Sequence, residues 1–312
     1  MTARHESRSL ALIVNPRAGG GIPRRRLPEV QSLLRTLGAE HRVALTDDLD
    51  HARELARDAT AAGEAAVAFG GDGLIGAIAD ELRHADGVLG ILPGGRGNDF
   101  ARSLGIPLDL GAACGVLATG AVGRLDLGLI GERAFVGIAS CGFDSVANRI
   151  ANETMVIRGR LVYAYAALRA LAHWRPVQFT VTIDGGPERS FSGYTVVVAN
   201  SRCYGGGMMI APGASVHDGM LDVVIVHHMS RLRFLRLLPM VFSGAHIRLE
   251  AVSMQRGAAV RVSASRPFTV YADGDPIAEL PATITTLPAA VRAILPATDR
   301  SVAAAALGPA TG

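Results

Sequence analysis

The sequence predicts an α/β protein, in which an N-terminal doubly wound parallel sheet precedes a C-terminal antiparallel, β-rich domain of sandwich-like form. Three observations support this prediction. Short apolar runs alternate with helical patterns over residues 1–130. Glycine-rich turns follow three of those apolar runs. After residue 177, apolar and polar residues alternate within a run, which is the period of a half-buried strand.

The N-terminal elements follow one another with short connections. The apolar runs predict strands at Leu10–Val14, His41–Leu45, Ala65–Phe69 and Val88–Leu92. The helical spacing of apolar residues predicts helices at Leu27–Leu37, His51–Ala61, Leu74–Leu82 and Phe100–Leu104. This alternation is typical of a parallel sheet with helices on both faces, which binds ligands at the carboxyl ends of its strands.

The C-terminal elements are mainly strands. They are expected at Gln178–Asp184, Tyr194–Ala199, Leu221–Val226, Ala258–Val262 and Phe268–Tyr271, with helices at about Gly159–Trp174 and Arg231–Phe242. A last helix is expected at Pro288–Leu295, returning to the first domain. The expected domains are therefore residues 1–130 and 131–296, followed by a disordered tail over residues 297–312.

The composition excludes several kinds of phosphate chemistry. The chain has 312 residues and 31 Lys+Arg, and each of these cations is an arginine. A Walker P-loop, a protein kinase active site and a Schiff-base enzyme all need a lysine, so none of them is present. A phosphate site here would use arginine, backbone N–H groups or a metal ion. A GC-rich genome would also explain the missing lysines.

Charge and cysteine content indicate where the protein acts. The net charge is +3, and only 5% of the residues are aromatic, with no basic run interleaved with aromatics, so no nucleic-acid partner is expected. The arginine excess falls after residue 130 and fits an anionic surface such as a membrane. Three separated cysteines predict reduced thiols in a cytoplasmic protein. Peripheral contact with the inner membrane face and a homodimer are both left open. Arg231–Leu238 reads either as a membrane-docking helix or as an ordinary amphipathic helix.

Three glycine-rich turns carry the candidate chemistry. Asn15–Gly21 follows the first strand, Gly70–Gly73 the third and Pro93–Arg102 the fourth. Glycine lets the backbone approach a phosphate closely, and Arg96 offers a planar fork that suits one. Asp72 is read either as a ligand of metal or hydroxyl groups or as a helix cap, and Asp99 as a cap.

A late acidic turn is the fourth candidate. Tyr271-Ala272-Asp273-Gly274-Asp275 follows an apolar strand. It is an ordinary Asp-Gly hairpin turn, or it supplies a carboxylate that takes a proton from an attacking hydroxyl.

Taken in order, these segments resemble the diacylglycerol kinase family of lipid kinases, which includes the sphingosine and ceramide kinases. The resemblance rests on NPRAGGG, GGDG, LPGGRGNDFARSLGIP, LDLG, FVGIASCGFDSVAN, the run from Val196 to Asp222 and YADGD, and covers about residues 8–296. GGDG is shared with NAD kinases, whereas YGGGM and the residues after it favour the lipid branch. The resemblance implies an ATP-dependent kinase acting on diacylglycerol or a related lipid alcohol, with Mg²⁺.

The resemblance also implies the site residues. ATP would be held by the turns and the end of the second strand, through Asn15, Thr46, Gly70, Gly71, Asp72, Gly73, Leu74, Gly95, Arg96 and Asn98. A structural Mg²⁺ would lie near Ser215, Asp218 and Met220, bound by the Asp218 carboxylate and the Met220 carbonyl. Asp273 would be the general base, with Asp275 nearby, and Asp72 would organise the metal and the acceptor hydroxyl.

Several positions depart from the family pattern. Leu74, Gly76 and Ala77 stand where the family has Thr, Asn and Glu; Arg96 replaces a common Thr, and Asp275 a Glu. These departures keep two alternatives open: a catalytically weak nucleotide- or lipid-binding regulator, and a kinase for another acceptor such as a sphingoid base or NAD.

Overall fold

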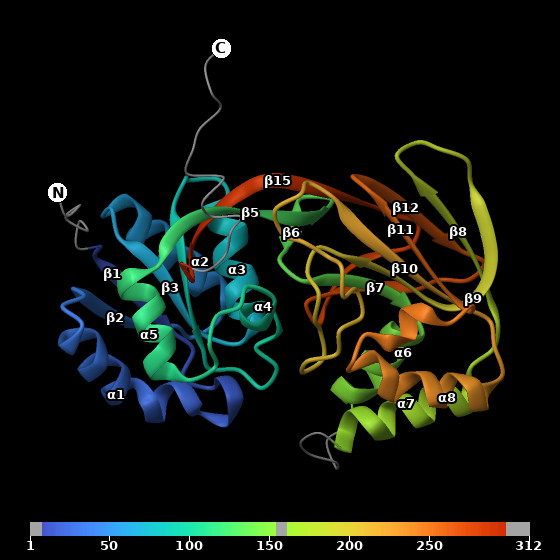
Figure 1. The fold of residues 1–312 in the computed structure, drawn as a ribbon, viewed down its shortest axis with the longest axis horizontal. Helices are drawn as coiled ribbons and strands as arrows, with labels where there is room; N and C mark the ends of the chain where they lie inside the picture. The colour runs from blue at the N-terminus through green and yellow to red at the C-terminus, as the bar shows by residue number, and fades with distance from the viewer. Residues whose placement is uncertain (1–7, 154–160, 298–312) are drawn as a thin grey trace.

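The computed structural model describes residues 8–153 and 161–297, and it shows two α/β units joined by long strands (Figure 1). The N-terminal unit holds a parallel sheet, and the C-terminal unit is mainly antiparallel, as the sequence predicts. The expected tail falls, apart from residue 297, outside the described residues. Among the described helices, none combines the length and the apolar character needed to cross a bilayer.

The N-terminal sheet has the strand order β2-β1-β3-β4, all parallel. Its strands are β1 (Leu10–Val14), β2 (His41–Leu45), β3 (Ala65–Gly70) and β4 (Val88–Pro93). Every residue of β1 and β3 is buried, because helices cover both faces of the sheet. Strands covered in this way are apolar throughout rather than alternating.

The helices of this unit form two layers, so the sheet is doubly wound. They are α1 (Ile22–Thr36), α2 (Leu49–Ala61), α3 (Asp72–Leu82), α4 (Asp99–Ser103) and α5 (Leu110–Thr119). α1 packs on α5, and α2 packs on α3. Side-chain caps define where α2 and α5 begin, because Asp48 accepts the N–H of His51 and Asp109 accepts the N–H of Ala112.

The C-terminal unit consists of antiparallel strands with three helices on one side. Its strands are β6 (Arg133–Phe135), β7 (Ile138–Gly142), β8 (Val177–Ile183), β9 (Arg189–Ala199), β10 (Leu221–His227), β11 (Val252–Gly257), β12 (Ala259–Ala264), β13 (Thr269–Ala272) and β14 (Asp275–Glu279). Its helices are α6 (Phe143–Glu153), α7 (Leu161–His173) and α8 (Arg231–Val241). An aromatic cluster of Phe143, Trp174, Tyr194 and Phe234 joins the helices to the sheet.

Two long strands connect the units, and one of them corrects the sequence prediction. β5 (Ala121–Ile130) and β15 (Ala282–Leu295) pair antiparallel, and the end of β15 also pairs parallel with β4. The chain therefore returns to the first unit over Pro288–Leu295, but as a strand and not as the expected helix. That segment fits between β4 and β5, where its backbone completes both ladders and Ala293 to Leu295 are buried.

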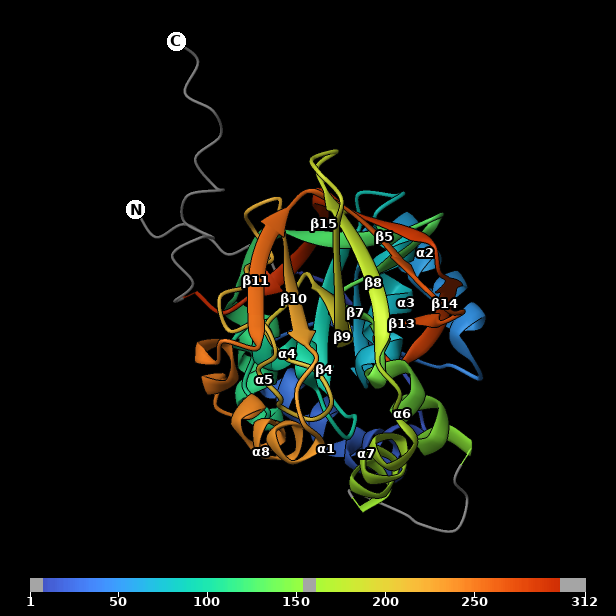
Figure 2. The same ribbon diagram turned by 90° about the vertical axis from the view of Figure 1, so that its right-hand side faces the viewer.

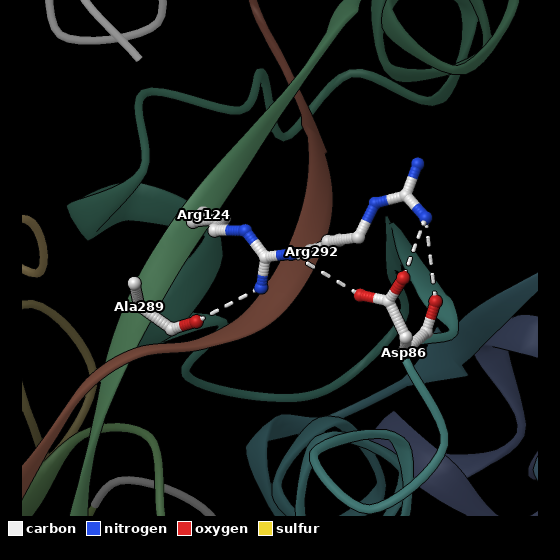
Figure 3. Close-up of polar contacts among 4 residues, drawn as sticks. All are labelled: Asp86, Arg124, Ala289 and Arg292. Atoms are coloured by element: carbon white, nitrogen blue, oxygen red, sulfur yellow. Dashed lines mark hydrogen bonds and ion pairs between the residues drawn. The ribbon is translucent and has the colours of Figure 1, made fainter. Parts of the chain in front are cut away.

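A surface ion cluster fastens these strands to the N-terminal unit (Figure 3). Asp86, in the loop before β4, accepts from Arg124 of β5 at 3.3 Å and from Arg292 of β15 at 3.4 Å. Arg124 also donates to the Ala289 carbonyl oxygen at 3.2 Å. All of these groups are solvent-exposed, so the cluster contributes little to the free energy of unfolding.

Candidate active site

The three glycine-rich turns meet at the carboxyl ends of the parallel strands. The N–H of Gly94 donates to the Gly70 carbonyl oxygen at 2.8 Å. A Cβ atom on Gly19 would lie 2.4 Å from the Gly94 carbonyl oxygen, and one on Gly95 would lie 2.5 Å from the Gly71 Cα. The three turns therefore converge in space, and glycine is needed in them because their backbones touch one another.

Helix α3 begins inside this cluster. It starts at Asp72, immediately after Gly71, and the N–H groups of Leu74 and Ile75 donate to the Gly71 carbonyl oxygen. The first N–H groups of a helix have no partner within the helix, and together with the helix dipole they attract an anion. We therefore expect a phosphate to bind at the start of α3, and we refer to this helix start as the phosphate cradle. Leu74 itself points into the core, where it is 2% exposed.

Two aspartates tie the turns to each other and to the C-terminal unit. Asp72 Oδ1 accepts the N–H of Phe100 at 3.0 Å, which links α3 to α4. Asp99 Oδ2 and Oδ1 accept the N–H groups of Gly206 at 2.8 Å and Gly207 at 2.6 Å. Burial, and to a smaller extent the charge of Asp72, raises the pKa of Asp99. Asp99 is thus more than the helix cap that the sequence suggested, since it holds the two units together beside the site.

The other predicted nucleotide contacts line the same edge, and most shape the turns. Both polar atoms of the Asn98 side chain bond the backbone of Gly95, at 2.8 and 3.2 Å. Asn15 Oδ1 accepts the N–H of Arg17 at 3.0 Å. The Thr46 hydroxyl is buried and donates to the Asp48 carbonyl oxygen. Arg96 is exposed on its turn, and no ion pair of its guanidinium is found in the described part of the chain.

The carboxylate of Asp273 is held by backbone. It accepts N–H groups from Val136 at 2.8 Å, Gly137 at 2.9 Å and Ile138 at 3.1 Å. Burial raises the pKa of Asp273 to about 7; these N–H groups oppose the shift, and the negative Asp72 adds to it. Its backbone is in the left-handed region, with φ of 51°. These contacts anchor the acidic turn to the start of β7.

Asp275 faces the phosphate cradle from the same turn. Its side chain is exposed, and a Cβ atom on Gly73 would lie 3.9 Å from Asp275 Oδ2. A Cβ atom on Gly76, almost one helical turn further along α3, would lie 3.5 Å from Asp273 Oδ2. Of the two acids, Asp275 is therefore the one nearer the start of α3.

Both acids line a pocket between α2, α3, β6 and the β13–β14 turn. Sequence reasoning missed two cationic members of its wall, Arg53 and Arg133. Arg53 is held by Asp50 at 2.7 Å, and Arg133 donates to the Pro276 carbonyl oxygen at 3.4 Å. The remaining lining residues are Leu49, Gly73, Gly76, Ala77, Ala134, Phe135, Ala272 and Ile277. The small residues at positions 76 and 77 leave this pocket open beside the acids.

The residues expected to bind a structural Mg²⁺ are not among those that line this pocket, and the Asp218 carboxylate is already engaged within the chain. The Arg256 guanidinium contacts Asp218 Oδ2 and lies 3.4 Å from Asp222 Oδ2. Asp218 Oδ1 accepts the N–H of Met220 at 3.1 Å, and Ser215 Oγ accepts that of His217 at 3.3 Å. Within residues 8–153 and 161–297, no three His, Cys, Asp or Glu side chains form a metal cluster. As arranged, this loop does not fit a Mg²⁺ ion, because a guanidinium already neutralises its carboxylate.

Glycine-rich turns at the start of a helix, beside carboxylates able to accept a proton, are the arrangement expected of a phosphotransferase. The diacylglycerol kinase catalytic domain family matches residues 9–130, and the YegS C-terminal NAD kinase β-sandwich-like domain family matches residues 137–295. The chain therefore belongs to the diacylglycerol kinase family of lipid kinases, which use ATP.

Individual relatives agree with this family. The chain is 36% identical over 300 residues to a diacylglycerol kinase of Mycobacterium tuberculosis, covering 94% of this chain and 97% of that protein. A Bacillus subtilis diacylglycerol kinase is 29% identical over 301 residues, with 91% and 95% of the two chains covered. The crystal structure of a diacylglycerol kinase from Bacillus anthracis shares the fold, with a TM-score of 0.71 and 20% identity over 93% and 97% of the two chains.

Proposed function

We propose that this lipid kinase transfers the γ-phosphate of ATP to the hydroxyl group of diacylglycerol or a closely related lipid alcohol presented by a membrane surface. The observation that carries the proposal is the position of Asp275 Oδ2 opposite Gly73 at the start of α3. That arrangement brings a proton acceptor to the place where helix N–H groups would hold the transferred phosphoryl group.

In the proposed step, the lipid hydroxyl oxygen forms a bond with the γ-phosphorus while the bond from that phosphorus to the β–γ bridging oxygen breaks. ADP leaves, and the hydroxyl proton passes to a carboxylate. We assign this proton to Asp275, because it is exposed in the pocket. Asp273 is a positioning residue in this proposal, because three backbone N–H groups hold its carboxylate and so fix the turn that carries Asp275.

Charge neutralisation comes from several directions. The backbone N–H groups at the start of α3 would face the phosphates, Arg53 and Arg133 line the pocket, and Arg96 lies exposed on the neighbouring Pro93–Arg102 turn. Preorganised groups of this kind stabilise the charge of a loose phosphoryl transition state. Mg²⁺ bound to the phosphates of ATP would add further positive charge, and Asp72 Oδ2 is the carboxylate oxygen of the GGDG turn available to it, since Oδ1 accepts from Phe100.

The two alternatives differ in what the protein would phosphorylate. The C-terminal family match and the lipid-kinase relatives favour a lipid acceptor over NAD. The presence of Asp273 and Asp275 in the pocket lining, with Asp72 at the start of α3, favours an enzyme over a regulator that only binds nucleotide.

An acceptor panel tests the proposal. The protein is incubated with γ-labelled ATP, Mg²⁺ and, separately, diacylglycerol, a monoacylglycerol, a sphingoid base and NAD. We expect label in the product of diacylglycerol or another glycerol-based lipid. Label in NAD phosphate or the sphingoid product alone would overturn the acceptor assignment, and nucleotide binding with no labelled product would favour the regulator.

A further inference from the structure

Helices α7 and α8 lie on the same side of the C-terminal unit and expose large apolar side chains. Figures 1 and 2 both place the two helices together below the strands of that unit. Tyr165 and Leu168 of α7 are 37% and 56% exposed, Leu232 of α8 is 60% exposed, and Phe242, which ends α8, is 49% exposed. These are four of the seven exposed large apolar residues among those the structure describes.

The exposed side chains are not the inward faces of these helices. α8 buries Phe234, Leu237 and Val241 against the strands, at the spacing of one helix face. Leu232 stands two residues before Phe234, on the other side of the helix. The outward apolar residues are therefore additional to those that the fold requires.

The same face is rich in arginine and carries no acid. Residues 161–177 and 228–249 contain no Asp or Glu, whereas Arg169, Arg175, Arg231, Arg233 and Arg236 are all exposed. Arg231 donates to the Trp174 carbonyl oxygen at 3.2 Å, and Arg266 stacks over the Trp174 ring at 5.3 Å, so the cations of neighbouring elements gather here. In the described part of the chain, none of these arginines pairs with a carboxylate.

We propose that α7 and α8 form a docking face for an anionic lipid bilayer, with Leu168, Leu232 and Phe242 entering the interface and the surrounding arginines contacting lipid phosphates. Apolar side chains flanked by cations are what a surface-bound helix uses at an anionic membrane. The face also adjoins the candidate site, because α6 packs between it and β13, the strand that leads into Asp273. This proposal rests on the proposed function, because the kinase would need to bind the membrane to reach an acceptor lipid held there.

Vesicle sedimentation without ATP or acceptor lipid tests this face separately from kinase activity. The full chain is mixed with vesicles of phosphatidylcholine alone, or of equal parts phosphatidylcholine and phosphatidylglycerol. We expect binding to the mixed vesicles that weakens with added salt, and little binding to phosphatidylcholine. The double variant Arg233→Glu/Arg236→Glu should lose at least about 30-fold in affinity for the mixed vesicles, since it replaces two cations of the docking face with anions.

Matched controls define the outcomes. Arg35→Glu/Arg261→Glu makes the same charge change at exposed arginines of α1 and β12, and should bind like the wild type. Both double variants should phosphorylate a short-chain, water-dispersed diacylglycerol at the wild-type rate, which shows that they fold. Equal vesicle binding by the two variants would overturn the docking face. A dimer that forms without vesicles and is abolished by Arg233→Glu/Arg236→Glu would assign the face to a second copy of the chain instead.

Discussion

Asp99 joins the two units of the molecule, since its Oδ2 accepts the backbone N–H of Gly206 at 2.8 Å across 107 positions of sequence. Gly207 donates to the other oxygen of the same carboxylate at 2.6 Å. The YGGG loop of the C-terminal unit is thereby fixed over the turn that carries Arg96 and Asn98. The Asp99 carboxylate therefore helps to hold the phosphate cradle and the acceptor side of the site in one arrangement, together with the Arg202 guanidinium, which donates to the Ser103 carbonyl oxygen at 3.0 Å.

Removal of the Asp99 carboxylate should loosen this junction. Asp99→Ala leaves two N–H groups without their charged acceptor, and we expect the free energy of unfolding to fall by about 2–4 kcal/mol. Urea denaturation measures the change. Asp50→Ala, at a largely exposed carboxylate that pairs with Arg53, is the control and should change stability by less than about 1 kcal/mol. A loss for Asp99→Ala no larger than that of the control would contradict the role of Asp99 as the junction.

The stability of the fold should depend on pH through Asp273. Its pKa in the folded protein is raised to about 7 by burial, above the usual value of 3.8, so the folded state binds a proton that the unfolded state has released. The free energy of unfolding should therefore fall as pH rises from about 4 to about 7, by at most about 1.4 kcal/mol per pH unit from this group. Asp144, with its pKa raised by burial to about 6, contributes in the lower part of the same range.

Substitution at each acid separates the two contributions. Asp273→Asn should flatten the pH dependence up to about pH 7, whereas Asp144→Asn should flatten it only up to about pH 6. Unfolding free energies of both variants across this range provide the measurement. A slope unchanged in Asp273→Asn would show that the Asp273 carboxylate is ionised throughout.

Removal of divalent metal should leave the fold intact. Because Arg256 neutralises Asp218, we expect the same melting temperature in Mg²⁺ and in EDTA for the wild type without nucleotide. Arg256→Gln leaves Asp218 and the buried Asp222 without their counter-charge, so this variant should melt lower and should recover part of the loss when Mg²⁺ is added. A wild type that melts lower in EDTA would instead place a structural metal in this loop.

Alanine substitution should weaken ATP binding at one glycine of the site and stabilise the fold at another. A methyl group on Gly95 would meet the Gly71 Cα at 2.5 Å, so Gly95→Ala should displace the turn and weaken ATP binding by at least about tenfold. At Gly76 the nearest atom would be Asp273 Oδ2 at 3.5 Å, an ordinary contact. Gly76→Ala should therefore raise the unfolding free energy by about 0.5–1 kcal/mol, the usual gain of alanine over glycine within a helix. Calorimetric titration with ATP and thermal melting check the pair, and equal ATP affinities in the two variants would contradict the close packing of the turns.

The N-terminal fold could be predicted from sequence because its signals are local. β1 and β3 are continuous apolar runs, and each glycine turn directly follows its strand, so the meeting of the turns follows from parallel topology. β15 could not be assigned in the same way. Pro288–Leu295 forms a strand because it pairs with both β4 and β5, and both of these strands are distant from it in sequence.

The sequence motifs predict which acids belong to the site, but they do not predict which role each acid has. The motifs named Asp72, Asp273 and Asp275, yet only the three-dimensional arrangement shows that backbone N–H groups from β6–β7 occupy Asp273 and leave Asp275 facing Gly73. Arg53 and Arg133 carry no motif, and they enter the pocket because α2 and β6 pack beside α3. Likewise, the sequence does not show that Arg256, 38 positions away, contacts Asp218. That contact makes the loop unsuited to the expected Mg²⁺ ion.

The most direct test compares the wild type with Asp275→Asn for transfer of label from γ-labelled ATP to diacylglycerol in anionic vesicles. We expect the wild type to produce labelled phosphatidic acid, and Asp275→Asn to do so about 10²–10⁴-fold more slowly, as loss of a general base predicts, with ATP affinity unchanged. Glu279→Gln, on the same hairpin but outside the pocket, should turn over like the wild type. No labelled lipid from the wild type, or undiminished transfer by Asp275→Asn, would contradict the proposed lipid kinase mechanism.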